Sequence, residues 1–381
     1  MDHEGRMGVI QYWRIGLVGA WLAATVSLAL AASTGSTPFQ PAIAGYQYAF
    51  PRDHGSHPTY RTEWWYYTGH LHTKGGRAFG FELTFFRRGI PPEDVTTLPS
   101  KWSVKDLYLA HFAVTDITGK RFHFSEKLSR EGLGKAGADE SKLQVWIDDW
   151  RVEAATDQIG AHSLIARDDT HALSLRLQPA KPLVTHGAAG ISRKGKDVGQ
   201  ASHYYSFTRL ETSGTLTIDG ESFDVTGLSW MDHEFGSGDL GADQVGWDWF
   251  SIQLEDNSEL MLYRMRLKDG SSDLASSGTI VFSDGRSRHL DVKDFAIESI
   301  GAWTSTESKA IYPNRWKLTL PSLDLMLDVV PLLADQELRT SRSSRVSYWE
   351  GAVAVTGTKQ SRPIKGQGYV ELTGYAERLK M

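Results

Sequence analysis

The chain has 381 residues, more than one hydrophobic core usually organises, so two domains of ordinary size are expected. Hydrophobic residues make up 40% and charged residues 23% of the sequence, which is typical of a globular protein. The formal net charge is −5 and Lys and Arg are scattered, so we expect no nucleic-acid partner. The chain has no cysteine, which excludes disulfides, a thiol nucleophile and lipoprotein acylation.

Residues 1–32 are predicted to be a signal peptide. Arg6 and Arg14 precede an uncharged stretch from Ile15 to Ala32, and Ala29-Leu30-Ala31 offers a small-x-small cleavage site. These features predict export, so that the mature protein is periplasmic or secreted. The apolar stretch is about 18 residues long, and an uncleaved membrane anchor is therefore the alternative.

After Pro38 the apolar residues recur at every second position, which is the period of a β-strand. One such run is Phe79, Phe81, Leu83 and Phe85, and turn pairs such as Asp219-Gly220 separate the runs, which indicates antiparallel hairpins. The predicted fold class is all-β. Up-and-down barrels and sandwiches both hide their strand edges, and the preferred version is two tandem lipocalin-like antiparallel β-barrels.

The two barrels are placed at 38–236 and 237–381, with the boundary at the Gly-rich segment Gly236-Ser237-Gly238. The residues from Gly187 to Gln200 are rich in Gly and Lys and are predicted to form a loop of the first domain. The chain contains 13 Trp, 14 Tyr and 15 Phe. Two uses of this aromatic load stay open: a large packed core, or an apolar cavity inside a barrel that holds a small molecule.

The segment Ser229–Gly236 carries the densest set of reactive groups. On a strand, Trp230, Asp232 and Glu234 share one face and His233 lies on the other. Successive carboxylates on that face are about 7 Å apart. In a cavity, desolvation and mutual repulsion would raise their pKa values and supply a general acid near neutral pH. The alternative is a structural role in which they pair with arginines such as Arg264 or Arg266.

Two further clusters combine acids with aromatic rings. In the segment Arg61–His70, Glu63, Trp65 and Tyr67 share one strand face, while Trp64 and Tyr66 lie on the other. Tyr348 with Glu350, and Tyr369 with Glu371, each place a Glu two residues after a Tyr. Such pairs can satisfy one another without any function.

We expect no metal and no cofactor. Asp232, His233 and Glu234 are good ligand types, as are His54 and His57 beside Asp53. Adjacent strand residues point to opposite faces, however, and no HExxH motif occurs. The sequence also lacks the G-x-S-x-G turn of serine hydrolases and any Gly-rich phosphate loop.

Five long aromatic motifs give the chain a resemblance to the lipocalin-like family that contains carotenoid 1,2-hydratases (hydroxyneurosporene synthases) and the bacterial AttH proteins, also called predicted secreted hydrolases. They run from about residue 50 to 375 and comprise Phe50-Pro51-Arg52-Asp53-His54-Gly55, Thr62-Glu63-Trp64-Trp65-Tyr66-Tyr67, Ser229-Trp230-Met231-Asp232-His233-Glu234-Phe235-Gly236, Gly246-Trp247-Asp248-Trp249-Phe250 and Tyr348-Trp349-Glu350-Gly351. The resemblance implies two lipocalin-like barrels side by side.

The hydratase branch of this family adds water to an isolated terminal alkene of an isoprenoid without a cofactor. By this resemblance Asp232 is the candidate acid, assisted by His233 or Glu234, although His233 faces away from Asp232 on a regular strand. A tertiary cation would be faced by Trp230, Trp247 and Trp249. The other residues assigned to substrate binding are Glu63, Trp65, Tyr67, Tyr348 and Glu350.

Two main functional hypotheses stay open. The first is a cofactor-free exported enzyme that hydrates an alkene of an apolar isoprenoid or lipid-like substrate, or performs a related lyase step. The second is a non-catalytic periplasmic lipid-binding protein or carrier, associated with the membrane or an ABC transporter. The residual alternatives are a hydrolase in which a carboxylate activates water, as the family label allows, and a metal enzyme.

Overall fold

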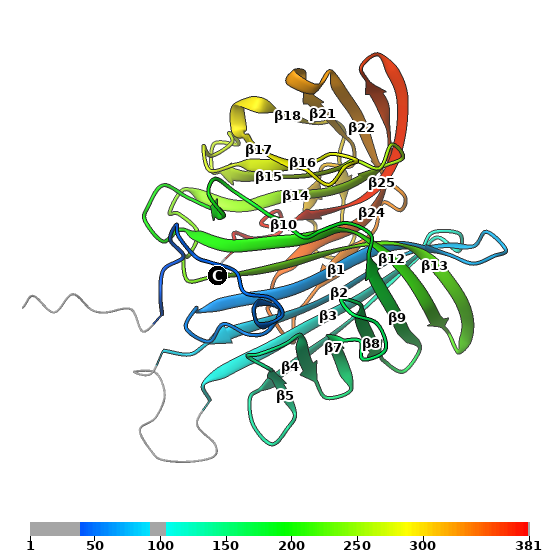
Figure 1. Cartoon of the computed structure of the whole chain (residues 1–381). Coiled ribbons are helices and arrows are strands. Elements are labelled where there is room, and N and C mark those ends of the chain that lie inside the picture. Colours follow the sequence, from blue (N-terminus) through cyan, green and yellow to red (C-terminus); the bar gives the residue numbers. More distant parts are fainter. Residues whose placement is uncertain (1–38, 92–103, 380–381) are drawn as a thin grey trace, which may run out of the picture. The chain divides into compact units, whose positions relative to one another are not determined.

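The computed structural model describes residues 39–91 and 104–379 (Figure 1). The predicted signal peptide therefore lies outside the described residues. Strands alternate with short turns, and the helical elements of the described residues are three short 3-10 turns at Arg52–His54, Val292–Asp294 and Pro321–Leu323. The predicted all-β class is confirmed. In the part of the chain described, no helix has the length and hydropathy needed to cross a bilayer.

The N-terminal sheet has 13 strands and is antiparallel throughout. Its order is β4 (Arg121–Arg130), β3 (Asp106–Asp116), β2 (Ala78–Gly89), β1 (Thr62–His72), β13 (Glu221–Gly236), β12 (Ala201–Ile218), β9 (His171–Pro179), β8 (His162–Arg167), β7 (Trp150–Ala154), β6 (Gln144–Ile147) and β5 (Ala136–Ala138), with β10 (Val184–Thr185) and β11 (Ile191–Arg193) paired to β12. The end strand β4 also contacts β5 and β6, so the sheet is a nearly closed barrel.

The C-terminal sheet has ten strands and is folded around its own core. Its order is β17 (Ser287–Asp291), β16 (Ser277–Val281), β15 (Glu259–Leu267), β14 (Gln244–Leu254), β25 (Arg362–Leu372), β24 (Ser347–Lys359), β22 (Leu325–Pro331), β21 (Trp316–Leu320) and β18 (Ala296–Ser299), with β23 (Glu337–Arg339) paired to β24. A separate two-stranded sheet joins β19 (Trp303–Thr304) to β20 (Ile311–Tyr312).

The strand alternation decides which side chains fill each barrel. On β2, Phe79, Phe81, Leu83 and Phe85 are fully buried in the core of the N-terminal sheet, as their spacing predicts. The turn between β12 and β13 is also as predicted: Asp219 and Gly220 have φ of 51° and 82°, the left-handed pair that a tight hairpin requires.

A third cluster of buried residues joins the two sheets. Tyr66, Tyr204 and Trp230 of the N-terminal sheet pack in it with Trp249 and Tyr369 of the C-terminal sheet. Strand β1 contacts β25, and β2 contacts β24. The outer faces of the two sheets therefore meet. The strands of the first sheet end at Gly236 and those of the second begin at Gln244. The described residues nevertheless pack as one compact unit, so the domain boundaries stay a prediction.

Candidate functional site

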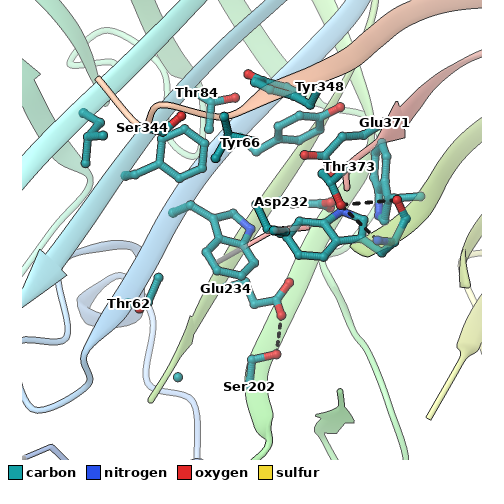
Figure 2. A pocket seen from close by; sticks show the side chains of 18 of the residues that line it. Thr62, Tyr66, Thr84, Ser202, Asp232, Glu234, Ser344, Tyr348, Glu371 and Thr373 are labelled. Atoms are coloured by element: carbon teal, nitrogen blue, oxygen red, sulfur yellow. Dashed lines mark hydrogen bonds between the residues drawn. The ribbon is translucent and has the colours of Figure 1, made fainter. Parts of the chain in front are cut away.

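A cavity of about 580 Å³ lies between the two sheets, a volume within the usual range for small-molecule sites. Most of its residues come from β1, β2, β3, β12 and β13 on one side and from β14, β15, β24 and β25 on the other, with Leu128 of β4 and some residues of the connecting segments. The lining includes Trp64, Tyr66, Glu82, Phe86, Leu107, Leu109, His111, Leu128, Lys194, Tyr204, Asp232, Glu234, Leu240, Trp247, Trp249, Met265, Tyr348, Glu350 and Glu371. Figure 2 shows several of these side chains around the cavity.

The cavity does not lie inside a barrel, as the sequence predicts, but between the two sheets. The inward faces of the two sheets are filled by packed side chains, such as Phe81 and Phe112 in the first sheet and Phe250 and Trp316 in the second. Because β-strand side chains alternate between faces, the acids and the remaining rings project from the outer faces. The inter-sheet cavity forms where these outer faces meet.

Asp232 is almost fully buried on β13 and accepts three hydrogen bonds. Trp230 Nε1 donates to Oδ1 at 2.6 Å, Ser206 also donates to Oδ1, and the Tyr204 hydroxyl donates to Oδ2 at 2.7 Å. Burial raises the pKa of Asp232 to about 7, with Glu234 adding like charge, although the three donors favour the carboxylate. Asp232 therefore titrates near neutral pH with both oxygens engaged.

Glu371 on β25 faces the same cavity and is half-buried. Trp247 Nε1 donates to its Oε2 at 2.7 Å, and no described residue donates to its Oε1. Burial raises the pKa of Glu371 to about 7, and the nearby carboxyls of Glu234 and Asp232 act in the same direction. Glu371 thus combines a titration near neutral pH with one unengaged oxygen.

Strand β14 links the two acids through its indoles. Trp247 and Trp249 lie on the same face, two residues apart. Trp247 holds Glu371, while Trp249 Nε1 donates at 3.1 Å to the hydroxyl of Tyr204, which in turn donates to Asp232. The acids of different sheets are therefore positioned by one strand.

Of the cavity acids Asp232, Glu234 and Glu371, only Glu234 forms an ion pair with a described residue. Lys194 Nζ lies 2.8 Å from Glu234 Oε1, and Ser202 donates to the same carboxylate (Figure 2). Lys194 comes from the Gly- and Lys-rich segment between β11 and β12, whose part in a site the sequence does not reveal. The suggested arginine partners Arg264 and Arg266 instead bind Asp248.

The structure brings most of the predicted site residues to this cavity. Asp232, Glu234, Trp247, Trp249, Tyr348 and Glu350 line it. Trp230 packs in the adjoining inter-sheet cluster and bonds to Asp232. Their roles in binding or catalysis remain predictions.

Four predicted site residues lie away from this cavity. Trp65 and Tyr67 are in the core of the N-terminal sheet, and Glu63 is buried on the same face of β1. His233 Nε2 lies 2.8 Å from Glu63 Oε1, and its Nδ1 lies 2.9 Å from the Tyr205 hydroxyl. The pairing of β12 and β13 is regular through His233, so no bulge turns this side chain toward Asp232.

Glu63 is the centre of a buried polar network. His57 Nδ1 lies 2.7 Å from Oε1 and Arg87 Nε lies 3.1 Å from Oε2. Hydrogen bonds from His233 and His57, with the charge of Arg87, hold the pKa of Glu63 well below its usual range despite burial. The ligand atoms of His57, Glu63 and His233 are close enough for a metal ion, but Arg87 already supplies a buried cation, which disfavours a second one.

A second possible ligand group is His123, Asp168 and His171. The two imidazole rings stack face to face, with centroids 3.8 Å apart and planes 5° apart. A metal ion binds in the plane of each imidazole ring, and one ion cannot lie in two stacked parallel planes. This group therefore fits a metal only after a ring rotates.

Several cavity residues were missed from the sequence. By its spacing, Glu371 forms a pair with Tyr369 that can satisfy itself, and Trp64 and Tyr66 lie on a second aromatic face to which the sequence assigns no role. Glu82 is the single acid in the apolar run of β2. An isolated acid in an apolar strand is the feature of the sequence that could have indicated a role for it.

A family model described as AttH-like matches residues 41–375. An AttH protein from Nitrosomonas europaea is similar to this chain at 34% identity and a TM-score of 0.79, covering 88% of this chain and 99% of the other. Kievitone hydratase from Nectria haematococca has a TM-score of 0.67 at 16% identity, covering 89% and 98%. At that identity the likeness shows the fold alone.

A curated relative is dehydratase asqC from Emericella nidulans, 24% identical over 200 residues. The match covers 50% of this chain and 55% of the dehydratase, so this chain spans about half the length of that relative.

Proposed function

This chain belongs to the AttH-like family, and we propose that it is an enzyme that adds water to, or removes it from, an apolar isoprenoid or lipid-like molecule in the inter-sheet cavity. Proteins named as a hydratase and a dehydratase are among those it resembles. The observation that carries the proposal is the pair Asp232 and Glu371. Both titrate near pH 7 and both face one cavity walled by tryptophan.

We assign the acid role to Glu371 rather than to Asp232. The unengaged Oε1 of Glu371 can carry a proton into the cavity, whereas both oxygens of Asp232 already accept hydrogen bonds. Asp232 is accordingly the base. Tyr204 lines the cavity and its hydroxyl donates to Asp232. It can therefore transfer its proton to Asp232 while its oxygen takes a proton from water.

Hydration then proceeds in two steps. The alkene electron pair takes the proton of Glu371, which forms a C–H bond and leaves a carbocation and the Glu371 carboxylate. Water forms the C–O bond, and its proton moves through Tyr204 to Asp232. The rings of Trp64, Trp247 and Trp249 stabilise the cation. Return of the proton from Asp232 to Glu371 resets the site without a cofactor, and dehydration is the reverse sequence.

The test is to incubate the mature protein with a panel of acyclic isoprenoid alkenes in heavy-oxygen water. We expect a labelled alcohol from the wild type, and none from Glu371→Gln, which can still accept the Trp247 hydrogen bond. Ligand affinity of the variant should be retained. Absence of labelled alcohol across the panel, with unlabelled alcohols also left intact, would refute the enzymatic proposal.

A carrier remains the second candidate, because an apolar wall of Phe86, Leu107, Leu109, Leu128 and Leu240 also suits a lipid held without reaction. Mass spectrometry of protein purified from its native host identifies any bound lipid. A ligand that is bound but never converted supports the carrier. Export, and association with a membrane or an ABC transporter, rest on the N-terminal sequence and the family resemblance and are proposed with either function.

A further inference from the structure

Two buried glutamates that the mechanism does not use, Glu82 and Glu350, line the inter-sheet cavity from different sheets. Glu82 lies on β2 and Glu350 on β24, two strands in contact across the sheet interface. Each residue is only 1% exposed. Two acids from separate parts of the chain are thus buried in one cavity.

Each of the two acids has one satisfied and one unsatisfied oxygen. Thr84 donates to Glu82 Oε1 at 2.7 Å, Tyr348 donates to the same atom at 3.4 Å, and Tyr66 donates to Glu350 Oε1 at 2.7 Å. The Oε2 atoms of both glutamates are buried and have no partner among the described residues. Figure 2 shows the donors Tyr66, Thr84 and Tyr348 together along one side of the cavity.

Neither acid has a cationic partner within the described residues. Other acids of this chain that are as deeply buried do: Glu63 pairs with Arg87, Asp248 with Arg264 and Glu259 with Lys181. Burial without a counter-charge favours the neutral acid. Accordingly, burial raises the pKa of Glu82 to about 8 and, with the charge of Glu371 adding to it, raises that of Glu350 well above its usual range.

A neutral carboxylic acid carries one O–H donor, and leaving a buried donor unpaired is unfavourable. We propose that Glu82 and Glu350 form a polar subsite that donates hydrogen bonds to an uncharged oxygen of the ligand. The ligand is then an oxygenated isoprenoid or lipid bearing a hydroxyl, ether or carbonyl group, and not a pure hydrocarbon. This inference rests on the proposed function only in taking the inter-sheet cavity as the binding site.

Charged groups suit the subsite less well. A ligand carboxylate would add an anion close to Asp232, Glu234 and Glu371. Three cations line the described part of the cavity: Lys194 is paired with Glu234, Arg87 is paired with Glu63 and Asp106, and Arg88 lies six residues from Glu82 on β2, roughly 20 Å along the strand. A ligand ammonium would bind well only if Glu82 and Glu350 gave up their protons. The neutral oxygen is the group that matches donors on uncharged acids.

The experiment measures binding of a matched C15 series by quenching of tryptophan fluorescence at pH 7. The probes are farnesene, farnesol, farnesylamine and farnesoic acid. We expect farnesol to bind about tenfold more tightly than farnesene, the gain that one good hydrogen bond gives. The amine and the carboxylic acid should bind more weakly than farnesol.

Paired substitutions identify the donors. Glu82→Gln and Glu350→Gln keep an uncharged donor, so they should preserve the preference for farnesol. Glu82→Leu and Glu350→Leu remove the donor and should reduce the preference to about onefold. The Leu variants remove an unpaired buried oxygen, but they also leave the hydroxyl of Thr84 or Tyr66 without its acceptor, so we expect a lower melting temperature than in the matching Gln variants. Retained affinity of the Leu variants for farnesene separates lost recognition from lost folding.

Equal affinity of the wild type for farnesol and farnesene would overturn the inference. The inference would also be overturned if farnesylamine bound most tightly, released a proton on binding and lost this affinity in the Gln variants. That pattern shows a carboxylate pair that binds a cation. Glu371→Gln should lack turnover and keep the preference for farnesol. A preference without turnover by the wild type would leave the subsite supported and refute only the proposed reaction.

Discussion

Asp232→Asn removes the ionisation of the most heavily hydrogen-bonded cavity acid while keeping the shape of its side chain. The amide oxygen of Asn can accept from Trp230 and Ser206, and the amide nitrogen can face the hydroxyl oxygen of Tyr204. Only the bond to Tyr204 is reversed, which costs about 1 kcal/mol. The variant should therefore fold.

The effect on stability depends on pH, with a definite sign. The pKa of Asp232 is raised from 3.8 to about 7 in the folded protein. As the pH rises from 4 to 7 the unfolded chain loses this proton while the folded chain keeps it, so the wild type loses stability. About three pKa units correspond to roughly 4 kcal/mol. Asp232→Asn should be about 1 kcal/mol less stable than wild type at pH 4 and about 3 kcal/mol more stable at pH 8.

Urea unfolding followed by tryptophan fluorescence at pH 4, 6 and 8 measures this difference. Asp284→Asn is the matched control, because Asp284 is half-exposed and bonds to Arg286 in a turn; it should show no gain in stability with pH. If the difference between Asp232→Asn and wild type stays constant or becomes more unfavourable with rising pH, Asp232 is ionised in the fold and the reasoning fails.

Three further predictions concern the same cavity. Glu371→Gln should lower kcat by about 10²- to 10⁴-fold, the usual contribution of a general acid, with little change in ligand affinity; a kcat within threefold of wild type excludes Glu371 as the acid. Trp249→Leu should reduce kcat/KM by about thirtyfold through loss of a ring facing the cation, whereas Trp249→Phe should lose only a few-fold; equal losses in the two variants would argue against that role. Lys194→Met leaves the buried Glu234 carboxylate unpaired and should lower the melting temperature, while the double variant Lys194→Met/Glu234→Gln should recover most of the loss; a double variant no more stable than Lys194→Met would contradict this coupling.

The periodicity of the sequence predicts much of the fold because each strand has to bury one face. Phe79, Phe81, Leu83 and Phe85 lie in one core as their spacing predicts, and the Asp219-Gly220 turn has the backbone that its residues favour. The same rule separates Asp232 from His233 correctly. It does not say which of the two faces meets a cavity, and this is why Glu63, Trp65 and Tyr67 were assigned to the site while Trp64 and Tyr66 were not.

The rest of the site depends on contacts between sheets, which no local pattern encodes. Glu371 becomes a candidate acid because Trp247 holds one of its oxygens and Asp232 and Glu234 lie close enough to oppose its ionisation. Lys194 reaches Glu234 from a loop whose composition suggests only a connection. Such placements follow from the packing of the two sheets and become visible only in three dimensions.

The pH dependence of kcat/KM for an alkene that the wild type hydrates shows directly whether Glu371 and Asp232 act as an acid and base pair. In the proposed mechanism the active form has one proton shared between the Glu371 and Asp232 pair, with both pKa values near 7. This mechanism predicts a narrow bell-shaped profile with its maximum near pH 7 and limbs that fall on both sides. A rate that stays level from pH 5 to pH 9 would contradict it.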